Sequence, residues 1–505
     1  MKNFFKDYRV VAALLVAVFV LSGALTLKAY PPVNYNLGDE IWATQNGINF
    51  PGLPHGPGEP VLYFAAIWAF QGIVGEGVFP VRLFSVLMAG VSLYLTFLIG
   101  KAVINEKAGL LSAALLATSF AFGWHARIAR PEMMTTVFVL SAFYLVVRGV
   151  KENPRFLFYG GLLTALSVNV HPNNLQYIAG MTFAYCALAK REVFSKKTLL
   201  YLSGILAGLA AWFIMIYLPS KSASMATPLT AAVGDITRVH QFPFMEKGLL
   251  GLLKESAVSF PKDYIFEYLR LFDDFFPNTI SVWFFAISAG LLWGLGLLTG
   301  KRRTALYLLC IPALTAFGNY FITYQFGYWH IIEFYPFLAL AMSAAALGLR
   351  DSQKKAGALV WAFLFIFCLA GVADTAACRQ RMRKYSYERL AHRVSEAVPE
   401  GARVIANFYM PAAKVKLLSP WFIEFDRPGR CPDFPEELER LSADYILMDD
   451  GLRTFMSKSC GPEYEAWAIR YLNLNFPVAY IDEQYPNYWA EGGLIKGVYV
   501  FRLRR

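Results

Sequence analysis

The stretch that decides the fold is AGLLSAALLATSFAFGWHARIARPEMMTTVFVLSAFYLVVRG, residues 108–149. In it, two long apolar runs flank the polar segment HARIARPE, residues 125–132. An α-helix rises about 1.5 Å per residue, so an apolar run of roughly 20 residues can cross the ~30 Å hydrocarbon core of a bilayer. The stretch therefore predicts two membrane-spanning helices joined by a short polar loop.

The rest of the chain repeats this pattern. Its 505 residues are 56% hydrophobic and only 16% charged, whereas an average soluble domain is about 25% charged. This composition excludes a disordered protein, a small disulfide-rich secreted scaffold and an ordinary soluble enzyme. The net charge of +11 lies largely in short loops between apolar runs, which indicates a membrane rather than a nucleic-acid partner.

We expect a multi-pass α-helical membrane protein with about eleven spans. A basic N-terminus precedes the first apolar run, residues 10–27, which is longer than the core of a cleavable signal peptide and so predicts an uncleaved span. The other spans are expected near 79–100, 108–124, 133–148, 156–170, 174–189, 199–218, 280–298, 304–322, 329–349 and 356–377.

Loop charges orient these spans. Each expected inner segment carries two to four Lys or Arg residues, whereas the short outer segments carry only Lys28, Arg127 and Arg130. This bias places the N-terminus in the cytoplasm and the C-terminus outside. The apolar run 61–75 is short, and we interpret it as a membrane-surface or re-entrant helix; a twelfth span is the alternative.

The chain divides into two expected domains. Residues 1–378 form the membrane domain, with outer loops at 28–60, 125–132 and 219–279, the last of which has amphipathic stretches typical of helices on a membrane surface. Residues 379–505 are richer in charge and Pro, and ARVIAN, ADYILMD and GVYVFRL read as strands between helices. They predict a small extracytoplasmic α/β domain, where a disulfide between Cys431 and Cys460 is compatible with an oxidising compartment.

Ionisable side chains gather at the expected outer ends of the spans. Such groups near a membrane core are costly and often functional. Two carboxylates with neighbouring cationic groups suit a reaction in which a proton is removed and a phosphate is stabilised. The candidate residues are Asp39, Glu40, His55, Arg127, Arg130, Glu132, His171 and His330.

Each candidate also has a structural interpretation. The pair Asp39 and Glu40 could cap a helix that runs through IWATQNG. Arg127 and Arg130 could reach lipid headgroups or pair with Glu132. The histidines could be ordinary interfacial residues, and no two of them have the helical spacing of a metal site.

The order of these motifs resembles the polyprenyl-phosphate-sugar-dependent glycosyltransferases of the C type (GT-C), the group of the protein O-mannosyltransferases and the lipid A aminoarabinose transferases. The resemblance rests on DE at 39–40, HGPGEPVLYFAAIWAFQG at 55–72 and the region 81–149, covers residues 30–190, and extends more loosely to 324–340. It implies the GT-C fold, with an outer cavity roofed by loops. It also implies a donor sugar linked through phosphate to an isoprenoid lipid.

The resemblance carries the catalytic carboxylate over to Asp39, with Glu40 as its neighbour or as an acceptor ligand. It assigns Arg127 and Arg130, with His171, to the donor phosphate. His55, Glu132 and His330 are then expected to contact substrate. We expect inverting transfer with Asp39 as base, and no required cofactor; a divalent cation (Mg²⁺ or Mn²⁺) held by Asp39, Glu40 and Glu132 is the alternative.

The expected partners are the lipid-linked donor, membrane lipids and an acceptor lipid, protein or glycan, with no nucleic acid. The expected location is the plasma (inner) membrane, with the active site on its outer face. Two other functions remain compatible with the sequence. One is a lipid or solute transporter without covalent chemistry, and the other is a lipid-carrier phosphotransferase.

Overall fold

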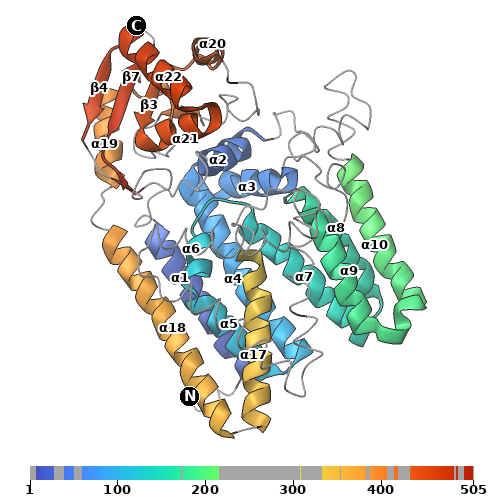
Figure 1. Cartoon of the computed structure of the whole chain (residues 1–505). Coiled ribbons are helices and arrows are strands. Elements are labelled where there is room, and N and C mark those ends of the chain that lie inside the picture. The colour runs from blue at the N-terminus through green and yellow to red at the C-terminus, as the bar shows by residue number, and fades with distance from the viewer. Residues whose placement is uncertain are drawn as a thin grey trace.

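The computed structural model describes residues 7–27, 39–50, 60–171, 174–214, 308, 332–352, 354–382, 387–406, 415–418, 431, 433–482, 485–486 and 494–503. The expected spans at 280–298 and 304–322, and the whole loop 219–279, lie outside these residues apart from Leu308. In Figure 1, a bundle of long helices occupies one part of the molecule, and a smaller part with a β-sheet holds the C-terminus.

The helical part follows the apolar runs of the sequence. Five of its described helices are long and apolar enough to cross a membrane. Its elements are α1 (Tyr8–Thr26), α2 (Asp39–Asn49), α3 (Val61–Val74), α4 (Val78–Val103), α5 (Glu106–Thr118), α6 (Phe120–His125), α7 (Glu132–Lys151), α8 (Arg155–Leu166), η3 (Ser167–Asn169), α9 (Leu175–Ala189), η5 (Lys190–Phe194), α10 (Lys196–Trp212), α17 (Tyr335–Ser352) and α18 (Lys354–Met382).

Helix boundaries follow local capping chemistry. Asn105 accepts a hydrogen bond from the backbone N–H of Ala108 and so starts α5, and Ser195 starts α10 in the same way. Ser119 lies in extended backbone between α5 and α6 and caps α6 through the N–H of Phe122. The run that we expected as one span near 108–124 is therefore interrupted at Ser119.

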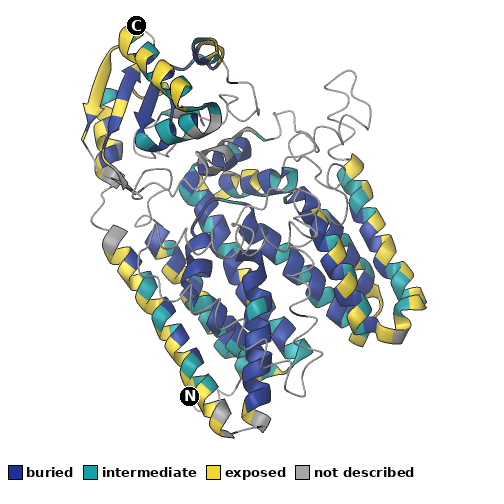
Figure 2. Cartoon of the chain, in the orientation of Figure 1, coloured by how far each residue is buried: buried dark blue, intermediate teal, exposed yellow. Residues whose placement is uncertain are grey.

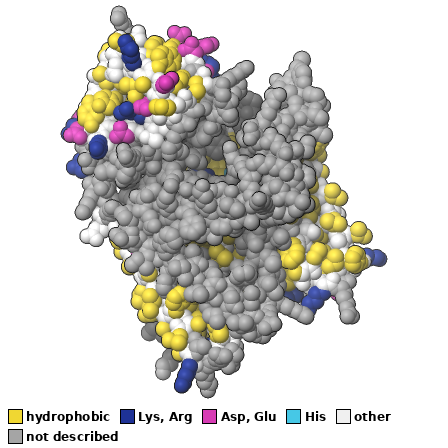
Figure 3. Space-filling model, in the orientation of Figure 1, with side chains coloured by type: hydrophobic (Ala, Val, Ile, Leu, Met, Phe, Trp, Pro, Cys, Tyr) yellow, Lys and Arg dark blue, Asp and Glu magenta, His cyan; other side chains and the backbone are white. Residues whose placement is uncertain are grey.

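Burial identifies the centre and the rim of the bundle. Helix α17 is almost wholly buried, and α4 and α7 are mostly buried, whereas only about a fifth of α1 and of α18 is buried. Figure 2 shows this contrast between the dark interior helices and the bright outer face of α18. The described surface of the helical part in Figure 3 is dominated by apolar side chains, as expected for helices that face lipid.

Helices α2 and α3 run across the end of the bundle that is nearer to the β-sheet (Figure 1). Helix α3 has 14 residues, about 21 Å at 1.5 Å per residue, which is too short to cross a bilayer upright. This geometry favours the surface helix over a twelfth span.

The C-terminal part is an α/β structure, as expected. Its main sheet has the order β2-β1-β3-β7-β4, with β1 parallel to β2 and β3, and β7 antiparallel to β3 and β4. The elements are α19 (Tyr387–Ala397), β1 (Arg403–Ile405), β2 (Lys416–Leu418), α20 (Phe434–Arg440), β3 (Tyr445–Asp449), α21 (Asp450–Cys460), α22 (Pro462–Asn475), β4 (Val478–Ile481), the short pair β5 (Tyr485–Pro486) and β6 (Leu494–Ile495), and β7 (Val498–Arg502).

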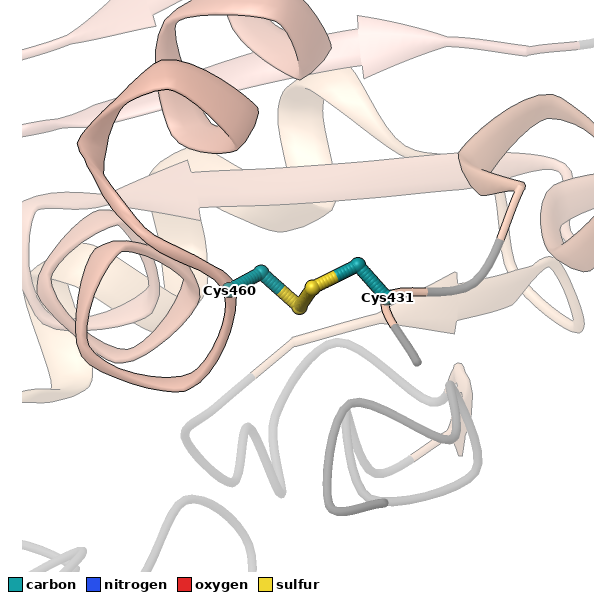
Figure 4. Close-up of a disulfide and its surroundings, with 2 residues drawn as sticks. All are labelled: Cys431 and Cys460. Carbon is teal, nitrogen blue, oxygen red and sulfur yellow. A yellow bond between two sulfur atoms is a disulfide. The ribbon is translucent and has the colours of Figure 1, made fainter. Parts of the chain in front are cut away.

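Alternate residues of the central strand face two separate cores. Leu447 packs in one apolar cluster with α19, and Ile446 packs in the other with α20, α21 and α22. Strand β3 is buried over its whole length, which is consistent with its apolar run YILM. The disulfide between Cys431 and Cys460, which the sequence allowed, is formed (Figure 4).

Candidate active site

Glu40 forms a buried ion pair with Arg82. The Arg82 Nε donates to Glu40 Oε1 at 2.9 Å, and Nη2 donates to Oε2 at 2.6 Å. The two side chains are only 2% and 1% exposed. This two-bond geometry is among the strongest charge-assisted contacts in proteins, and it fixes the start of α2 to the start of α4.

The same carboxylate also joins the first outer loop to the second. The backbone N–H of Ala129, within HARIARPE, donates to Glu40 Oε1 at 2.8 Å. Asp39 is the first residue of α2, so the helix through IWATQNG that the structural interpretation allowed is present and begins at the acidic pair. The side chain of Asp39 lies outside the described part of the structure. Its backbone position, however, is set by the contacts of Glu40.

Arg130 pairs with Glu132. Its Nε donates to Glu132 Oε1 at 2.8 Å, and its Nη2 lies 2.6 Å from the same oxygen. Glu132 is buried in the first turn of α7, where a carboxylate also interacts favourably with the helix dipole. Arg130 is 11% exposed, so the second outer loop carries a partly accessible guanidinium next to a buried carboxylate.

His171 lies in a tight turn after η3 and is half-buried. Its backbone N–H donates to the Ser167 carbonyl, and its own carbonyl accepts from the N–H of Asn174. The Asn174 side chain donates to the Ser167 carbonyl and to Thr135 Oγ1 at 3.2 Å, which ties the turn to α7. The side chain of Asn174 therefore ties the chain next to His171 to α7.

One apolar cluster brings these segments together. It contains Ala43 of α2, Ala129 of the second outer loop, Met134 of α7 and Val170 next to His171, packed with side chains of α3 and α4. Each of these four residues is within four positions of Glu40, Arg130, Glu132 or His171. The structure therefore gathers the acidic pair, the arginine–acid pair and the histidine turn at one end of the bundle.

Arg127 faces another set of residues. Its Nε donates to Thr26 Oγ1 of α1 at 3.0 Å, and its Nη1 donates to the Gly123 carbonyl. Its neighbours Ala126 and Ile128 belong to a second cluster, with Phe19 and Trp124. The two arginines of HARIARPE are thus directed to different surroundings, which their spacing in the sequence did not reveal.

Two expected substrate contacts, His55 and His330, lie outside the described residues. Within the described part of the chain, no group of three His, Cys, Asp or Glu side chains is arranged to hold a metal ion. Both carboxylate oxygens of Glu40 are already engaged by Arg82 and the Ala129 N–H. Among the described side chains of the site, the two glutamates are therefore paired with arginines, Glu40 with Arg82 and Glu132 with Arg130.

Sequence reasoning missed several buried polar groups. Arg82 was hidden within an apolar run, although a lone Arg near the start of a span is itself a functional signal. Tyr177 of α9 donates to Glu333 at 2.5 Å in the interior of the bundle. Asn169 is 1% exposed, and its side-chain amide has no hydrogen-bond partner among the described residues.

The chain is similar to a known protein family over part of its length. Residues 58–217 match the model of the family described as dolichyl-phosphate-mannose-protein mannosyltransferase. A protein of Aquifex aeolicus described as uncharacterized is 28% identical over 192 residues, which are 37% of this chain. The match spans only 38% of that relative's length.

Among solved structures, the chain resembles ArnT from Cupriavidus metallidurans bound to undecaprenyl phosphate, with a TM-score of 0.61 at 11% identity over 97% of both chains. The apo state of the same protein gives a TM-score of 0.56 at 12% identity, again over 97% of both chains. At this identity the likeness establishes the fold. The expected multi-pass helical architecture with a small C-terminal sheet is therefore confirmed, while the number of spans stays a prediction.

Proposed function

We propose that the chain is a membrane glycosyltransferase of the GT-C fold, which its match to the mannosyltransferase family model and its likeness to ArnT support. In this proposal it transfers a sugar from a polyprenyl-phosphate donor to an acceptor on the outer face of the membrane. The single observation that carries this proposal is the contact of Glu40 with Ala129. It joins the acidic pair of the first outer loop to the arginine–acid pair of the second. The proposed transfer needs this proximity, because the base that takes the acceptor proton and the cation that meets the leaving phosphate must act on the same donor.

The reaction that fits these groups is an inverting displacement. Asp39 accepts the proton of the acceptor as the acceptor attacks the anomeric carbon, and the bond from that carbon to the phosphate oxygen breaks. The electron pair of that bond leaves with the polyprenyl phosphate. A phosphate is already a good leaving group, so the step needs one base and no general acid.

Arg130 and His171 are proposed to contact the donor phosphate. The Arg130 guanidinium is partly accessible and held beside Glu132, so it is oriented before substrate arrives. A cation positioned in this way offsets the charge that grows on the leaving phosphate, and one such donor can contribute about 3–4 kcal/mol to transition-state stabilisation. His55, Glu132 and His330 remain proposed substrate contacts.

Glu40 is proposed as a positioning residue rather than as a second base. Its two oxygens accept from Arg82 and from the Ala129 N–H, and it is 1% exposed. A carboxylate in this state is a poor proton acceptor and a poor metal ligand. We therefore propose that Arg130, and not a divalent cation, balances the phosphate charge, and that EDTA leaves transfer unchanged.

The plasma membrane, with the site and the C-terminal domain outside, is the proposed location. The bias of Lys and Arg toward the expected inner loops supports this orientation. The disulfide between Cys431 and Cys460 supports it independently, because disulfides persist in oxidising compartments.

The test uses the full-length protein in proteoliposomes supplied with synthetic undecaprenyl-phosphate sugars and a cell-envelope extract as acceptor source. Mass spectrometry follows the release of undecaprenyl phosphate and the gain of a sugar by an acceptor. We expect both products with the native chain and neither with Asp39→Asn. The matched control is Asp482→Asn, an exposed position in the C-terminal part, which should transfer normally.

The same assay separates the other two functions. Sugar-lipid that crosses the membrane unchanged would favour a transporter. An acceptor that gains a phosphate would favour a phosphotransferase. Full transfer by folded Asp39→Asn protein would remove Asp39 as the base.

A further inference from the structure

A crevice of about 710 Å³ lies between α1, α18 and the junction of α5 with α6. Its walls come from one face of α1, from Ala117 to Ser119, from Gly123 and Arg127, and from one face of α18. Helix α18 packs on the end of α5, where Gly371 lies against the Thr118 carbonyl. Because α1 and α18 are the least buried of the described membrane-spanning helices, we place the crevice at the lipid-facing rim of the bundle.

The crevice changes character along its length. On α1, the lining residues Leu15, Val18 and Phe19 precede Thr26, which lies about 16 Å further along the helix than Leu15. On α18, Val372 likewise precedes Arg379. The two helices run in the same direction in Figure 1, so one end of the crevice is apolar, while the other is polar and cationic.

The charged groups of this lining have one sign. Arg127 and Arg379 line the polar end, and no carboxylate is among the described lining residues. Arg127 is 5% exposed and is held in place by its bonds to Thr26 and to the Gly123 carbonyl. The hydroxyls of Thr26, Ser119 and Thr375 add hydrogen-bonding groups at the same end.

This crevice is separate from the candidate active site. Its described lining includes no residue of α2, α3, α4 or α7. Arg127 is flanked by residues of the apolar cluster that contains Phe19, whereas Ala129, two positions later, belongs to the cluster around α2 and α3. The second outer loop therefore presents opposite sides to two different sites.

We propose that the crevice between α1 and α18 binds a membrane lipid whose headgroup ends in a phosphomonoester. A phosphomonoester carries about −1.5 to −2 charges at pH 7 and three strong acceptor oxygens, which match two guanidinium groups. A phosphodiester headgroup carries only one charge and offers fewer terminal oxygens. The hydrocarbon chain lies along Leu15, Val18 and Val372 and continues into the bilayer.

In the reaction proposed above, the spent carrier is a lipid of this kind, because cleavage at the anomeric carbon leaves the phosphate as a monoester. The crevice would then hold the lipid product at a distance from the base. This assignment of the occupant rests on the proposed function, whereas the lipid site itself does not.

The experiment uses the full-length protein in phosphatidylcholine nanodiscs and a photoactivatable farnesyl phosphate, with the cross-linked peptides mapped by mass spectrometry. We expect labelling of α1 and α18 that excess farnesyl phosphate removes and excess phosphatidylglycerol does not. Arg379→Gln should weaken this labelling at least tenfold, and Arg379→Lys should restore part of it.

A matched pair of variants tests the location. Ala376 and Ala377 are adjacent exposed residues of α18, but only Ala376 is among the residues that line the crevice. Ala376→Trp should remove the labelling of α1 and α18, and Ala377→Trp should leave it. Thermal unfolding of both variants establishes that they are folded.

Absent labelling of α1 and α18, equal competition by phosphatidylglycerol, or full labelling of Ala376→Trp would overturn the proposal. The Asp39→Asn protein separates the two hypotheses, because it should still be labelled in the crevice. A chain that binds farnesyl phosphate between α1 and α18 but transfers no sugar would refute the proposed function alone.

Discussion

Glu40 and Arg82 lie 42 positions apart in the sequence and form a two-bond ion pair that is almost completely sealed from solvent. The pair holds the first turn of α2, and with it the backbone of Asp39, against α4. A catalytic base must be held to within about 0.5 Å of its productive position. The buried pair therefore holds the backbone of the proposed base in place, although burying two charges costs desolvation free energy.

Breaking this pair should destabilise the protein strongly. Arg82→Met leaves the Glu40 carboxylate buried without its cation, which costs about 3–5 kcal/mol. The double variant Glu40→Gln/Arg82→Met removes both charges, so it should unfold at a higher temperature than Arg82→Met alone. The measurement is thermal unfolding in detergent, with transfer activity recorded in parallel.

The control is an exposed ion pair. Lys197 and Glu192 are 25% and 53% exposed, and such pairs contribute about 1 kcal/mol or less. Lys197→Met should therefore change stability little. An Arg82→Met protein as stable as Lys197→Met would show that the buried pair does not hold α2.

Much of the fold could be predicted because its signals are local. The apolar runs located α1, α4, α7 and α9, and the strands ARVIAN, ADYILMD and GVYVFRL are β1, β3 and β7. Hydrophobic periodicity and length are sufficient for such elements. The break at Ser119 was missed because a single capping hydroxyl is hard to distinguish from the many Ser and Thr residues of membrane helices.

The site was less predictable, because its contacts join distant segments. The acidic pair and HARIARPE could be selected as polar groups at span ends, but nothing in the spacing pairs Glu40 with Arg82. The opposite directions of Arg127 and Arg130 depend on the fold of the loop between α6 and α7. Asp39, His55 and His330 stay predictions, since their side chains lie outside the described residues.

The contact of α8 with α10 depends on two glycines. A Cβ atom at Gly161 would lie 2.2 Å from the Tyr201 carbonyl oxygen, and one at Gly204 would lie 2.0 Å from the Phe158 carbonyl oxygen. Small residues let membrane helices approach this closely. Gly161→Ala and Gly204→Ala should each lower the unfolding temperature in detergent, because backbone must move to relieve the contact.

Gly72 provides a control at which alanine should change the unfolding temperature in the opposite direction. It lies within α3, and a Cβ atom there meets nothing within 4 Å. Alanine is favoured over glycine in a helix by about 1 kcal/mol, so Gly72→Ala should raise the unfolding temperature. Equal effects at Gly72 and Gly204 would mean that helix propensity, and not the close approach of α8 and α10, governs the outcome.

Removing Arg130 should lower the rate of transfer, and it should also lower stability, because the buried Glu132 then loses this cation. Arg130→Gln removes the cation proposed to meet the leaving phosphate and should lower kcat by about 10²–10³-fold, the range seen when one transition-state donor is removed. Arg130→Lys keeps the charge but loses the planar fork, so it should recover part of the rate. Steady-state transfer kinetics measure both, and a normal kcat in Arg130→Gln would assign Arg130 to the ion pair with Glu132 alone.

The disulfide links the segment before α20 to the last residue of α21. Cys431 and Cys460 are 29 positions apart, and closing a loop of this size stabilises a domain by about 3.6 kcal/mol in the chain-entropy model. We expect Cys431→Ser/Cys460→Ser to make residues 387–503 of the full-length protein more sensitive to limited proteolysis. Cys186→Ser, which changes a free cysteine in α9, should leave the cleavage pattern unchanged.

The same cysteines report on which side of the membrane the C-terminal part lies. In intact cells, a membrane-impermeant maleimide should label Cys431 and Cys460 only after an impermeant reductant has opened the bond, because both reagents reach only the outer face. Labelling that needs permeabilised cells would place this part in the cytoplasm. The eleven-span topology would then be wrong, because its odd number of crossings puts the two termini on opposite sides. The proposed location of the active site on the outer face would be wrong as well.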